Sequence, residues 1–501
     1  MVPLMEKLTC DLLDPLKKLK KKNVSFSLPA DVGAATVLAQ SVTLGMIAGW
    51  PTVSVPLLLA GHGPVSTTPD QVSWLTTLHF LGNLLSPVPA GYLMDHWGRR
   101  TTLTVASILP VVAWPVVALC DTTTQLVVAW FVVGMWSGVV YTVVPVYLGE
   151  IAKPQQRGLL GTLFSAARRL GAATEFVLGQ VLTYRQLALI SALPAILSAL
   201  LLLRAPESPY YLLRRRRDRQ AAGEALKQLR PMHESHDLER ELDDIERFVN
   251  ERTKGGYRSL IATGTGRRAL FVMEALAILQ RLSDTGAVMG YIAASLPPRP
   301  LPFLEKQHAV MGLEAAKLFT GLISTLVIDL FTRKSLMLTA SLACTAAMFW
   351  SGTWYLLVPT GTYNLHSTNY DLRTGTAWMP YGCLALHQAG YSLGLSPVFW
   401  SLRSELFPMA VKAQSSAITT TTLALVACVV NRMFFIIAQE FGIYLNYYIF
   451  CISCLLNALV TVFFVVETGG KTLSQIQDDL DEAPSKDNDA SADTRTQIPA
   501  V

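Results

Sequence analysis

The chain has 501 residues, of which 51% are hydrophobic and only 15% are charged, whereas a soluble protein is about 25% charged. This composition is typical of a membrane protein. The formal net charge of +5 falls on segments between apolar runs, which argues against a nucleic-acid partner. Because no motif for phosphate binding, nucleophilic catalysis or metal ligation is evident, the sequence predicts neither an enzyme nor a cofactor.

The first half of the chain begins with a polar, lysine-rich segment, 1–33. The first apolar span, at about 34–60, contains two glycines and two prolines, which predict a kinked or broken helix. Five more spans follow, near 71–94, 101–120, 125–149, 158–183 and 186–203. Each is long enough to cross a hydrocarbon core about 30 Å thick, so we expect 34–203 to form one six-helix half.

A charged stretch, 204–268, separates this half from the next. Its apolar residues recur at helical spacing, which predicts short amphipathic helices on the cytoplasmic face. These residues are Leu226, Leu229, Leu238, Leu242, Ile245 and Phe248. Six further spans lie near 269–295, 308–328, 335–358, 380–402, 413–439 and 443–466. The sequence therefore predicts an all-α membrane protein with twelve transmembrane helices, a second half at 269–466 and a cytoplasmic tail at 467–501.

Basic residues collect in alternate loops between these spans, which predicts the orientation in the membrane. The basic loops include the linker 204–268 and the loops that hold Arg99, Arg100, Lys153, Arg157, Arg333, Lys334, Arg403 and Lys412. The remaining loops hold only Arg185, Arg299, Lys306 and Arg373. Since cytoplasmic loops carry an excess of Lys and Arg, we expect a multi-pass protein of the cell membrane with both termini in the cytoplasm.

One order of charges, an acid, a basic pair, a glutamate and a base, occurs twice in the chain. The first copy is Asp95, Arg99, Arg100, Glu150 and Arg157, and the second is Asp329, Arg333, Lys334, Glu405 and Lys412. The repetition indicates an internal duplication of the kind found in transporters. Half-solvated ion pairs of about 1 kcal/mol each could latch the helix ends reversibly. The alternative is that these charges serve membrane topology alone.

Five motifs occur in one order along most of the chain. They begin at Gly91 (GYLMDHWGRR), Pro145 (PVYLGEIA), Pro206 (PESPYYLL), Gly394 (GLSPVFW, followed by ELFP) and Glu467 (ETGGKTL). Together they resemble the sugar porter family of the major facilitator superfamily. Within it the chain looks most like insect facilitated trehalose and sugar transporters, partly because of Arg432. The resemblance implies the major facilitator fold and facilitated diffusion of trehalose or a hexose by alternating access.

The resemblance also implies where the sugar would bind, and there the chain departs from the family. The corresponding positions are Ser165, Gln280, Arg281, Asp284, Lys317 and Trp400. Gln280 and Trp400 are retained as hydrogen-bonding and ring-stacking groups, whereas the other positions are substituted. Arg281 and Asp284, at i and i+3, could neutralise each other, or the cavity could have become charged. The substitutions leave two other functions open, a carrier of organic anions and a non-transporting sensor or scaffold.

Two further features bear on the substrate and on coupling. Arg168 and Arg169 follow Ser165 by three and four residues, so they share its helix face and should face the cavity. The first span contains no Asp or Glu. Proton-coupled members of the family typically carry an acid there, so the resemblance implies passive facilitation rather than proton symport, although Asp284 could titrate. The expected partners are a small-molecule solute and the lipid bilayer, with the oligomeric state left open.

Overall fold

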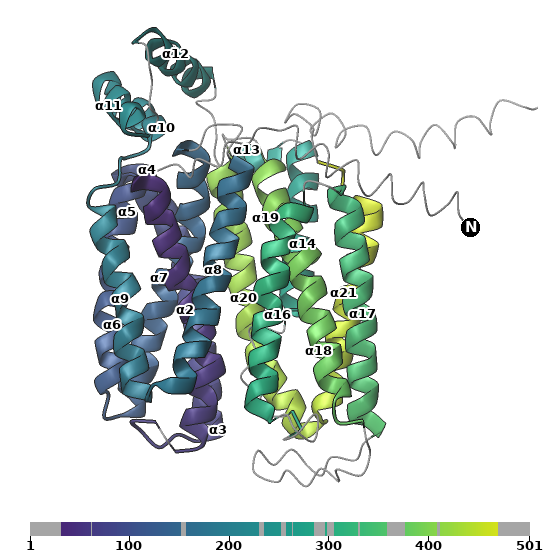
Figure 1. The fold of residues 1–501 in the computed structure, drawn as a ribbon. Coiled ribbons are helices and arrows are strands. Elements are labelled where there is room, and N and C mark those ends of the chain that lie inside the picture. The colour runs from purple at the N-terminus through teal and green to yellow at the C-terminus, as the bar shows by residue number, and fades with distance from the viewer. Residues whose placement is uncertain are drawn as a thin grey trace, which may run out of the picture.

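The computed structural model describes residues 32–468, except 62, 152–156, 230–234, 252–256, 263, 285–295, 298–304, 329–330, 358–375 and 408–410. Long helices run side by side through most of these residues and form two bundles (Figure 1). Within the described part of the chain, seven helices are long and apolar enough to cross a membrane. The chain is therefore a helical multi-pass membrane protein, as its composition predicts.

The first bundle follows the expected spans, with two of them interrupted. Its helices are α2 (Val32–Leu59), α3 (Pro69–Leu85), α4 (Pro87–Trp97), α5 (Arg99–Ala106), α6 (Ile108–Leu119), α7 (Thr123–Ile151), α8 (Arg157–Val181) and α9 (Tyr184–Leu202). The expected second span is divided at Ser86, where Pro87 begins a new helix, and the third is divided at Ser107.

The second bundle follows a group of shorter helices. That group is α10 (Pro209–Tyr211), the π-helix η1 (Leu212–Arg216), α11 (Arg219–Leu229), α12 (Ser235–Glu251) and α13 (Tyr257–Ala262). The bundle contains α14 (Gly264–Leu282), α16 (Lys306–Val327), α17 (Arg333–Leu357), α18 (Met379–Gly390), the π-helix η4 (Tyr391–Leu395), α19 (Ser396–Glu405), α20 (Lys412–Glu440) and α21 (Ile443–Phe464). A π-turn inside a helix often marks a functional site, and η4 lies beside the cavity described below.

Glycines bring α2 against α8, and this contact positions one wall of the cavity. A Cβ on Gly45 would lie 1.9 Å from the carbonyl oxygen of Arg168, and one on Gly171 would lie 2.1 Å from that of Val42. Only glycine permits such a close approach between membrane helices. The first span was expected to be kinked or broken, and it is not broken, since α2 continues through both of its prolines. Its glycines serve helix packing.

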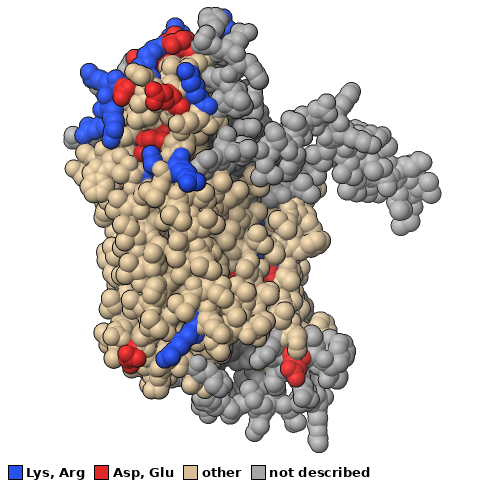
Figure 2. Space-filling model, turned by 60° about the vertical axis from the view of Figure 1, so that its left-hand side comes forward, with Lys and Arg blue, Asp and Glu red and all other residues tan. Residues whose placement is uncertain are grey.

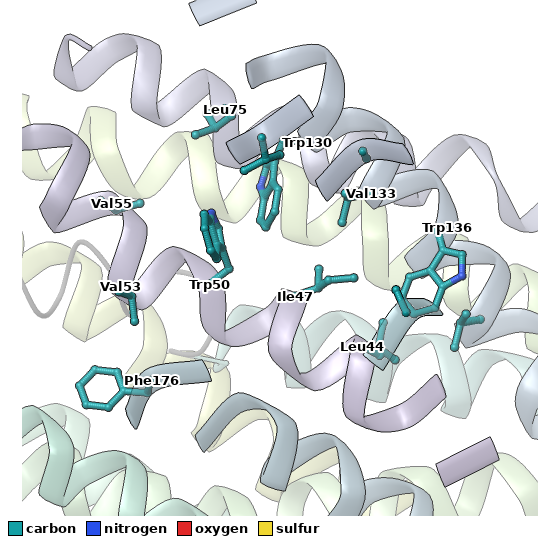
Figure 3. Close-up of a cluster of buried hydrophobic side chains, with 14 of the residues drawn as sticks. Leu44, Ile47, Trp50, Val53, Val55, Leu75, Trp130, Val133, Trp136 and Phe176 are labelled. Atoms are coloured by element: carbon teal, nitrogen blue, oxygen red, sulfur yellow. The ribbon is translucent and has the colours of Figure 1, made fainter. Parts of the chain in front are cut away.

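The core of the first bundle is built around Trp50 of α2. Its ring centroid lies 5.0 Å from that of Trp114, 6.1 Å from that of Trp130 and 5.3 Å from that of Tyr184. Figure 3 shows the rings of Trp50 and Trp130 beside each other, with Ile47 close by. All four rings are nearly inaccessible to solvent. Edge-to-face contacts of this kind add about 0.5–1.5 kcal/mol per pair to the burial of apolar area.

The outer surface carries a broad apolar belt. Figure 2 shows this belt below a crown of Lys, Arg, Asp and Glu, with few charges at the opposite end. Large apolar side chains stand out from it, including Val181, Leu357 and Phe463. An exposed apolar area on this scale is typical of a membrane-spanning protein.

The short helices between the bundles stand at the charged end of the molecule (Figure 1). The predicted apolar face exists, since Leu226, Leu238, Leu242 and Ile245 are buried in one small cluster. Leu229 is buried as well, but against the core of the first bundle, and the side chain of Phe248 lies outside the described residues. Arg219 joins α11 to α12 through ion pairs with Glu239, Asp243 and Glu246 at 2.6–2.8 Å. The hydrogen bonds to Glu239, and then to Asp243, raise the pKa of Arg219.

Candidate functional site: a central cavity and charged helix ends

A cavity lies between the two bundles and takes its walls from both. The first bundle contributes α2, α3, α7 and α8, and the second contributes α14, α16, η4, α19 and α20. Five of the six expected substrate positions line it, namely Gln280, Arg281, Asp284, Lys317 and Trp400. The sixth, Ser165, is buried on α8 but is not part of the wall. Sites between helices of a bundle are where carriers bind their substrates.

Trp400 forms an aromatic contact across the cavity. Its ring stacks on that of Tyr141, with centroids 6.0 Å apart and planes 12° apart. Tyr141 belongs to α7 in the first bundle and Trp400 to α19 in the second. The neighbouring Phe399 packs edge-on against Trp400 at 5.6 Å. Trp400 therefore offers an aromatic surface at a point where the bundles meet.

Two acids in the cavity wall are paired with bases. Arg281 and Asp284 form an ion pair at 2.7 Å, so the predicted contact between them is present. Lys317 and Glu314 form a second pair at 3.4 Å. The guanidinium of Arg281 also lies over the ring of Phe80 in the other bundle, 5.2 Å from its centroid. Arg281 is thus held on both sides of the cavity.

Arg169 reaches from the first bundle into the second. Its Nη1 donates to the carbonyl oxygen of Gly321 at 3.1 Å, and its Nη2 donates to that of Ser392 at 3.5 Å. The absence of a side chain at Gly321 makes room for it, because a Cβ there would lie 2.5 Å from Cδ of Arg169. Arg168 lines the cavity too, so both arginines lie on the side expected from their position.

Arg403 is a cavity residue that the loop assignment missed. It was expected to be one of the cytoplasmic loop bases, and that expectation is wrong. The side chain is buried on α19, where Nη2 donates to the carbonyl and hydroxyl oxygens of Ser416, at 2.8 and 2.6 Å, and to Oγ1 of Thr420 at 2.6 Å. The available signal is its spacing, three residues after Trp400 and therefore on the same helix face.

The first copy of the repeated charges forms a network at one end of the first bundle. Arg99, which is 4% exposed, places Nη2 at 2.9 Å from Oε1 of Glu150 and at 3.6 Å from Oδ1 of Asp95. The Ser208 hydroxyl donates to the other Glu150 oxygen at 2.5 Å. The expected association of these three charged residues is present. The side chain of Arg157 lies outside the described residues.

Glu207 completes this network and was not among the expected charges. Its carboxylate accepts from the backbone N–H groups of Arg99 at 2.9 Å, Arg100 at 3.1 Å and Thr101 at 3.4 Å. These N–H groups begin α5 and have no partner within the helix. The Arg100 side chain donates to the carbonyl oxygens of Leu202 and Leu203 at the end of α9. Glu207 therefore ties the start of α5 to the end of α9.

The second bundle repeats this arrangement. Glu467 accepts from the backbone N–H groups of Arg333 and Lys334, both at 3.0 Å. Lys334 Nζ donates to the carbonyl oxygen of Val462 at 2.7 Å, and Arg333 donates to that of Ile328. Asp329 lies outside the described residues, as do the side chains of Glu405 in α19 and Lys412 in α20. The duplicated motif thus produces duplicated contacts at the starts of α5 and α17.

A third set of contacts joins the bundles at the end opposite to Arg99. Arg432 of α20 forms an ion pair with Asp70 of α3 at 2.9 Å and lies 4.8 Å from the ring centroid of Trp74. The neighbouring residue, Asn431, donates to the hydroxyl of Thr77 at 3.1 Å. The first bundle is therefore linked to the second at this end by both charged and neutral groups.

Two helical bundles around a shared cavity, enclosed by an apolar belt, define a membrane carrier for a small solute. The chain belongs to the sugar (and other) transporter family, whose family model matches residues 42–480. The expected sugar porter is thus confirmed. Family membership makes a small-molecule sugar the class of solute.

Individual relatives agree with this assignment. The chain is 25% identical to a facilitated trehalose transporter Tret1 of Bombyx mori over 89% of this chain and 86% of that protein. It is 26% identical to the facilitated glucose transporter member 8 of solute carrier family 2 of Mus musculus, over 87% and 91% of the two chains.

Solved structures confirm the predicted fold. The major facilitator proton:xylose symporter XylE, bound to 6-bromo-6-deoxy-D-glucose, superposes with a TM-score of 0.71 at 19% identity, covering 89% of this chain and 98% of that one. An inward-open structure of XylE from E. coli gives a TM-score of 0.66 at 20% identity, with the same coverage. The twelve-helix major facilitator fold is therefore the fold of this chain.

Proposed function

We propose that the protein is a uniporter that moves a sugar of one or two rings across the cell membrane, with trehalose and hexoses as the first substrates to test. The observation that carries this proposal is the cavity shared by the two bundles, whose wall includes Gln280 and Trp400. The names of the relatives, which include trehalose and glucose transporters, support the choice of sugars.

Gln280 and Trp400 are the proposed substrate contacts. The Gln280 amide can both donate to and accept from sugar hydroxyls. Trp400 offers a ring face against which the apolar side of a pyranose can pack. Two ion pairs belong to the same wall. Arg281 pairs with Asp284, and Lys317 pairs with Glu314. Ser165 lies behind the wall and takes no part.

Uniport is favoured over proton coupling by the distribution of acids. Helix α2 contains no charged residue, so it offers no proton site beside the cavity. Asp284, the titratable acid considered from the sequence, is held in an ion pair with Arg281 at 2.7 Å. Because Asp284 already has a basic partner, we propose uniport rather than proton symport.

Alternating access is proposed to use the two ends of the molecule in turn. The networks of Arg99 and Arg333 would fasten the cytoplasmic ends of the helices, and the contact of Arg432 with Asp70 would fasten the outer ends. The exposed Arg432–Asp70 pair contributes about 1 kcal/mol or less, so thermal motion can break it during the cycle. The Arg99–Glu150 pair is more buried than the half-solvated pair expected from the sequence, with side chains 5% and 12% exposed, so breaking it costs more. Both termini are proposed to be cytoplasmic, and a monomer contains every group that this cycle uses.

The test is counterflow of labelled glucose and trehalose into liposomes that contain the purified protein. Trp400→Ala should lower sugar uptake about tenfold, since one aromatic contact contributes about 1.5 kcal/mol at most. Trp350→Ala removes a ring that is 54% exposed on α17 and should leave uptake within about twofold. If the folded protein moves neither sugars nor organic anions, a sensor or scaffold replaces the carrier proposed above.

A further inference from the structure

The cavity contains more positive than negative charge. Its wall holds five basic side chains and two acidic ones. Both acids, Asp284 and Glu314, already have a basic partner in the wall. The bases that remain are Arg168, Arg169 and Arg403, and among the described residues none of the three forms an ion pair. A neutral sugar would leave this excess unbalanced.

Arg403 shows the imbalance most clearly. The residue is 5% exposed, yet its Nε and Nη1 are buried with no hydrogen-bond partner among the described atoms. Its Nη2 has only neutral acceptors, on Ser416 and Thr420. The one acid of α14, Glu274, interacts electrostatically with Arg403. Its carboxylate accepts a hydrogen bond from Thr419 at 2.7 Å and makes none with Arg403. Counting Glu274 still leaves two positive charges in excess.

Among the residues that the structure describes, no other Asp or Glu lines the cavity. Residues 285–295, which continue the chain after α14, contain no Asp or Glu in the sequence. Helix α2 contains none either. Unpaired charges at membrane depth are costly, and they normally pair or face a functional pathway. The counter-charge is therefore best supplied by what enters the cavity.

We propose that the transported sugar is an acidic one, with a carboxylate or phosphate group that binds between Arg403 and the Arg168–Arg169 pair. This inference rests on the proposed sugar transport and names the substrate class. The Arg403 guanidinium lies 5.1 Å from the ring centroid of Trp400. A sugar ring packed on Trp400 thus has its substituents within reach of Arg403, whose Nε and Nη1 have no hydrogen-bond partner among the described residues and can donate to an oxyanion.

The position of the arginines also suits alternating access. Arg168 and Arg169 belong to α8 in the first bundle, whereas Arg403 belongs to α19 in the second, and these two helices contact each other. An anion between them attracts both walls at once. The anion therefore binds more tightly when the bundles are closed around it than when they are open. Such a difference in affinity is what a ligand-driven conformational change requires.

Uptake of glucuronate, glucose 6-phosphate and glucose into liposomes under a set membrane potential tests the proposal. Uniport of a monoanion moves charge, so an inside-positive potential of about 100 mV should raise the final glucuronate accumulation about 50-fold. The same potential should leave glucose unaffected. If glucuronate competes with glucose uptake and glucose 6-phosphate does not, the site is selective for a carboxylate. The opposite result indicates a site for a phosphate.

Variants locate the site. Arg403→Gln should weaken anion competition about tenfold or more, and Arg403→Lys should weaken it less because the charge remains. Arg168→Gln should act in the same direction without loss of a hydrogen bond or ion pair, since Arg168 makes neither among the described residues. Arg185→Gln, on an exposed position at the start of α9, makes the same chemical change away from the cavity and should have no effect.

The outcomes separate this inference from the function on which it rests. Glucose transport with no competition by either anion overturns the acidic substrate and leaves sugar transport intact. Anion uptake that survives both Arg168→Gln and Arg403→Gln unchanged also overturns it, because the site must then lie elsewhere. The absence of any flux contradicts the proposed transport itself.

Discussion

Glu207 should be the most sensitive single position at the charged end of the first bundle. Its carboxylate accepts from four backbone N–H groups, those of Arg99, Arg100, Thr101 and Ser208. The chain must turn sharply at this point, and Gly98 does so with φ of 101°, a conformation that disfavours side chains. The turn aims the first N–H groups of α5 at one carboxylate.

The expected cost follows from the number and kind of these bonds. Glu207→Gln keeps one acceptor oxygen but removes the negative charge, which contributes about 0.3–1 kcal/mol at a helix N-terminus, and weakens the charge-assisted bonds. We expect a destabilisation of about 1–2 kcal/mol. Glu207→Ala also leaves half-buried N–H groups without their acceptor, so its effect should be larger than that of Glu207→Gln.

Thermal unfolding in detergent with a thiol-reactive dye measures this effect directly. The thiols of Cys120, Cys344 and Cys454 are free and buried, so they react as the bundles open. At about 2–4 °C per kcal/mol for a unit the size of one bundle, Glu207→Gln should lower Tm by about 2–8 °C. Glu224→Gln, on the exposed face of α11, is the matched control. A Tm for Glu207→Gln within about 1 °C of the wild type would refute the reasoning.

Two further predictions concern the contacts between helices. Gly45→Ala should destabilise the protein by about 3 kcal/mol or more, since its Cβ would lie 1.9 Å from the Arg168 carbonyl oxygen and overpacking costs at least about 1–3 kcal/mol; an unchanged Tm in the same assay would contradict the close approach. Arg432→Gln removes the ion pair with Asp70 and should favour the outward-facing state by up to about fivefold, or about 1 kcal/mol. The readout is the rate at which an impermeant external reagent alkylates a cysteine placed at Thr52, and an unchanged rate counts against an outer latch.

Local patterns predicted a large part of the structure. The apolar spacing of the linker identified the buried face of α11 and α12, because one helical period decides which side chains meet. The Arg281–Asp284 pair followed from i,i+3 spacing in the same way. The association of Arg99 with Glu150 followed from the duplicated order of charges, which placed both residues at the ends of predicted spans.

Contacts that depend on the register between distant helices could not be predicted. Glu207 lies 108 positions from the N–H group of Arg99 that it accepts from, and Glu467 lies 134 positions from that of Arg333. A pattern did exist, since each glutamate follows the last span of its half and precedes Ser or Thr. Arg403 was assigned to a loop because hydropathy marks the end of a span only to within a turn, and one turn decides between solvent and cavity.

Alternating access is tested most directly by the distance between spin labels on the cytoplasmic ends of the two bundles. Labels at His96 and Thr332, both exposed, should give two distance populations in the purified protein, and a transported sugar should change their ratio. Glu150→Gln weakens the Arg99 contact at 2.9 Å, which holds the ends of α4, α5 and α7 together. Because α4 contacts α20 of the other bundle, the substitution should enrich the longer distance. A single distance that neither the sugar nor Glu150→Gln alters would contradict a reversible latch on the cytoplasmic side.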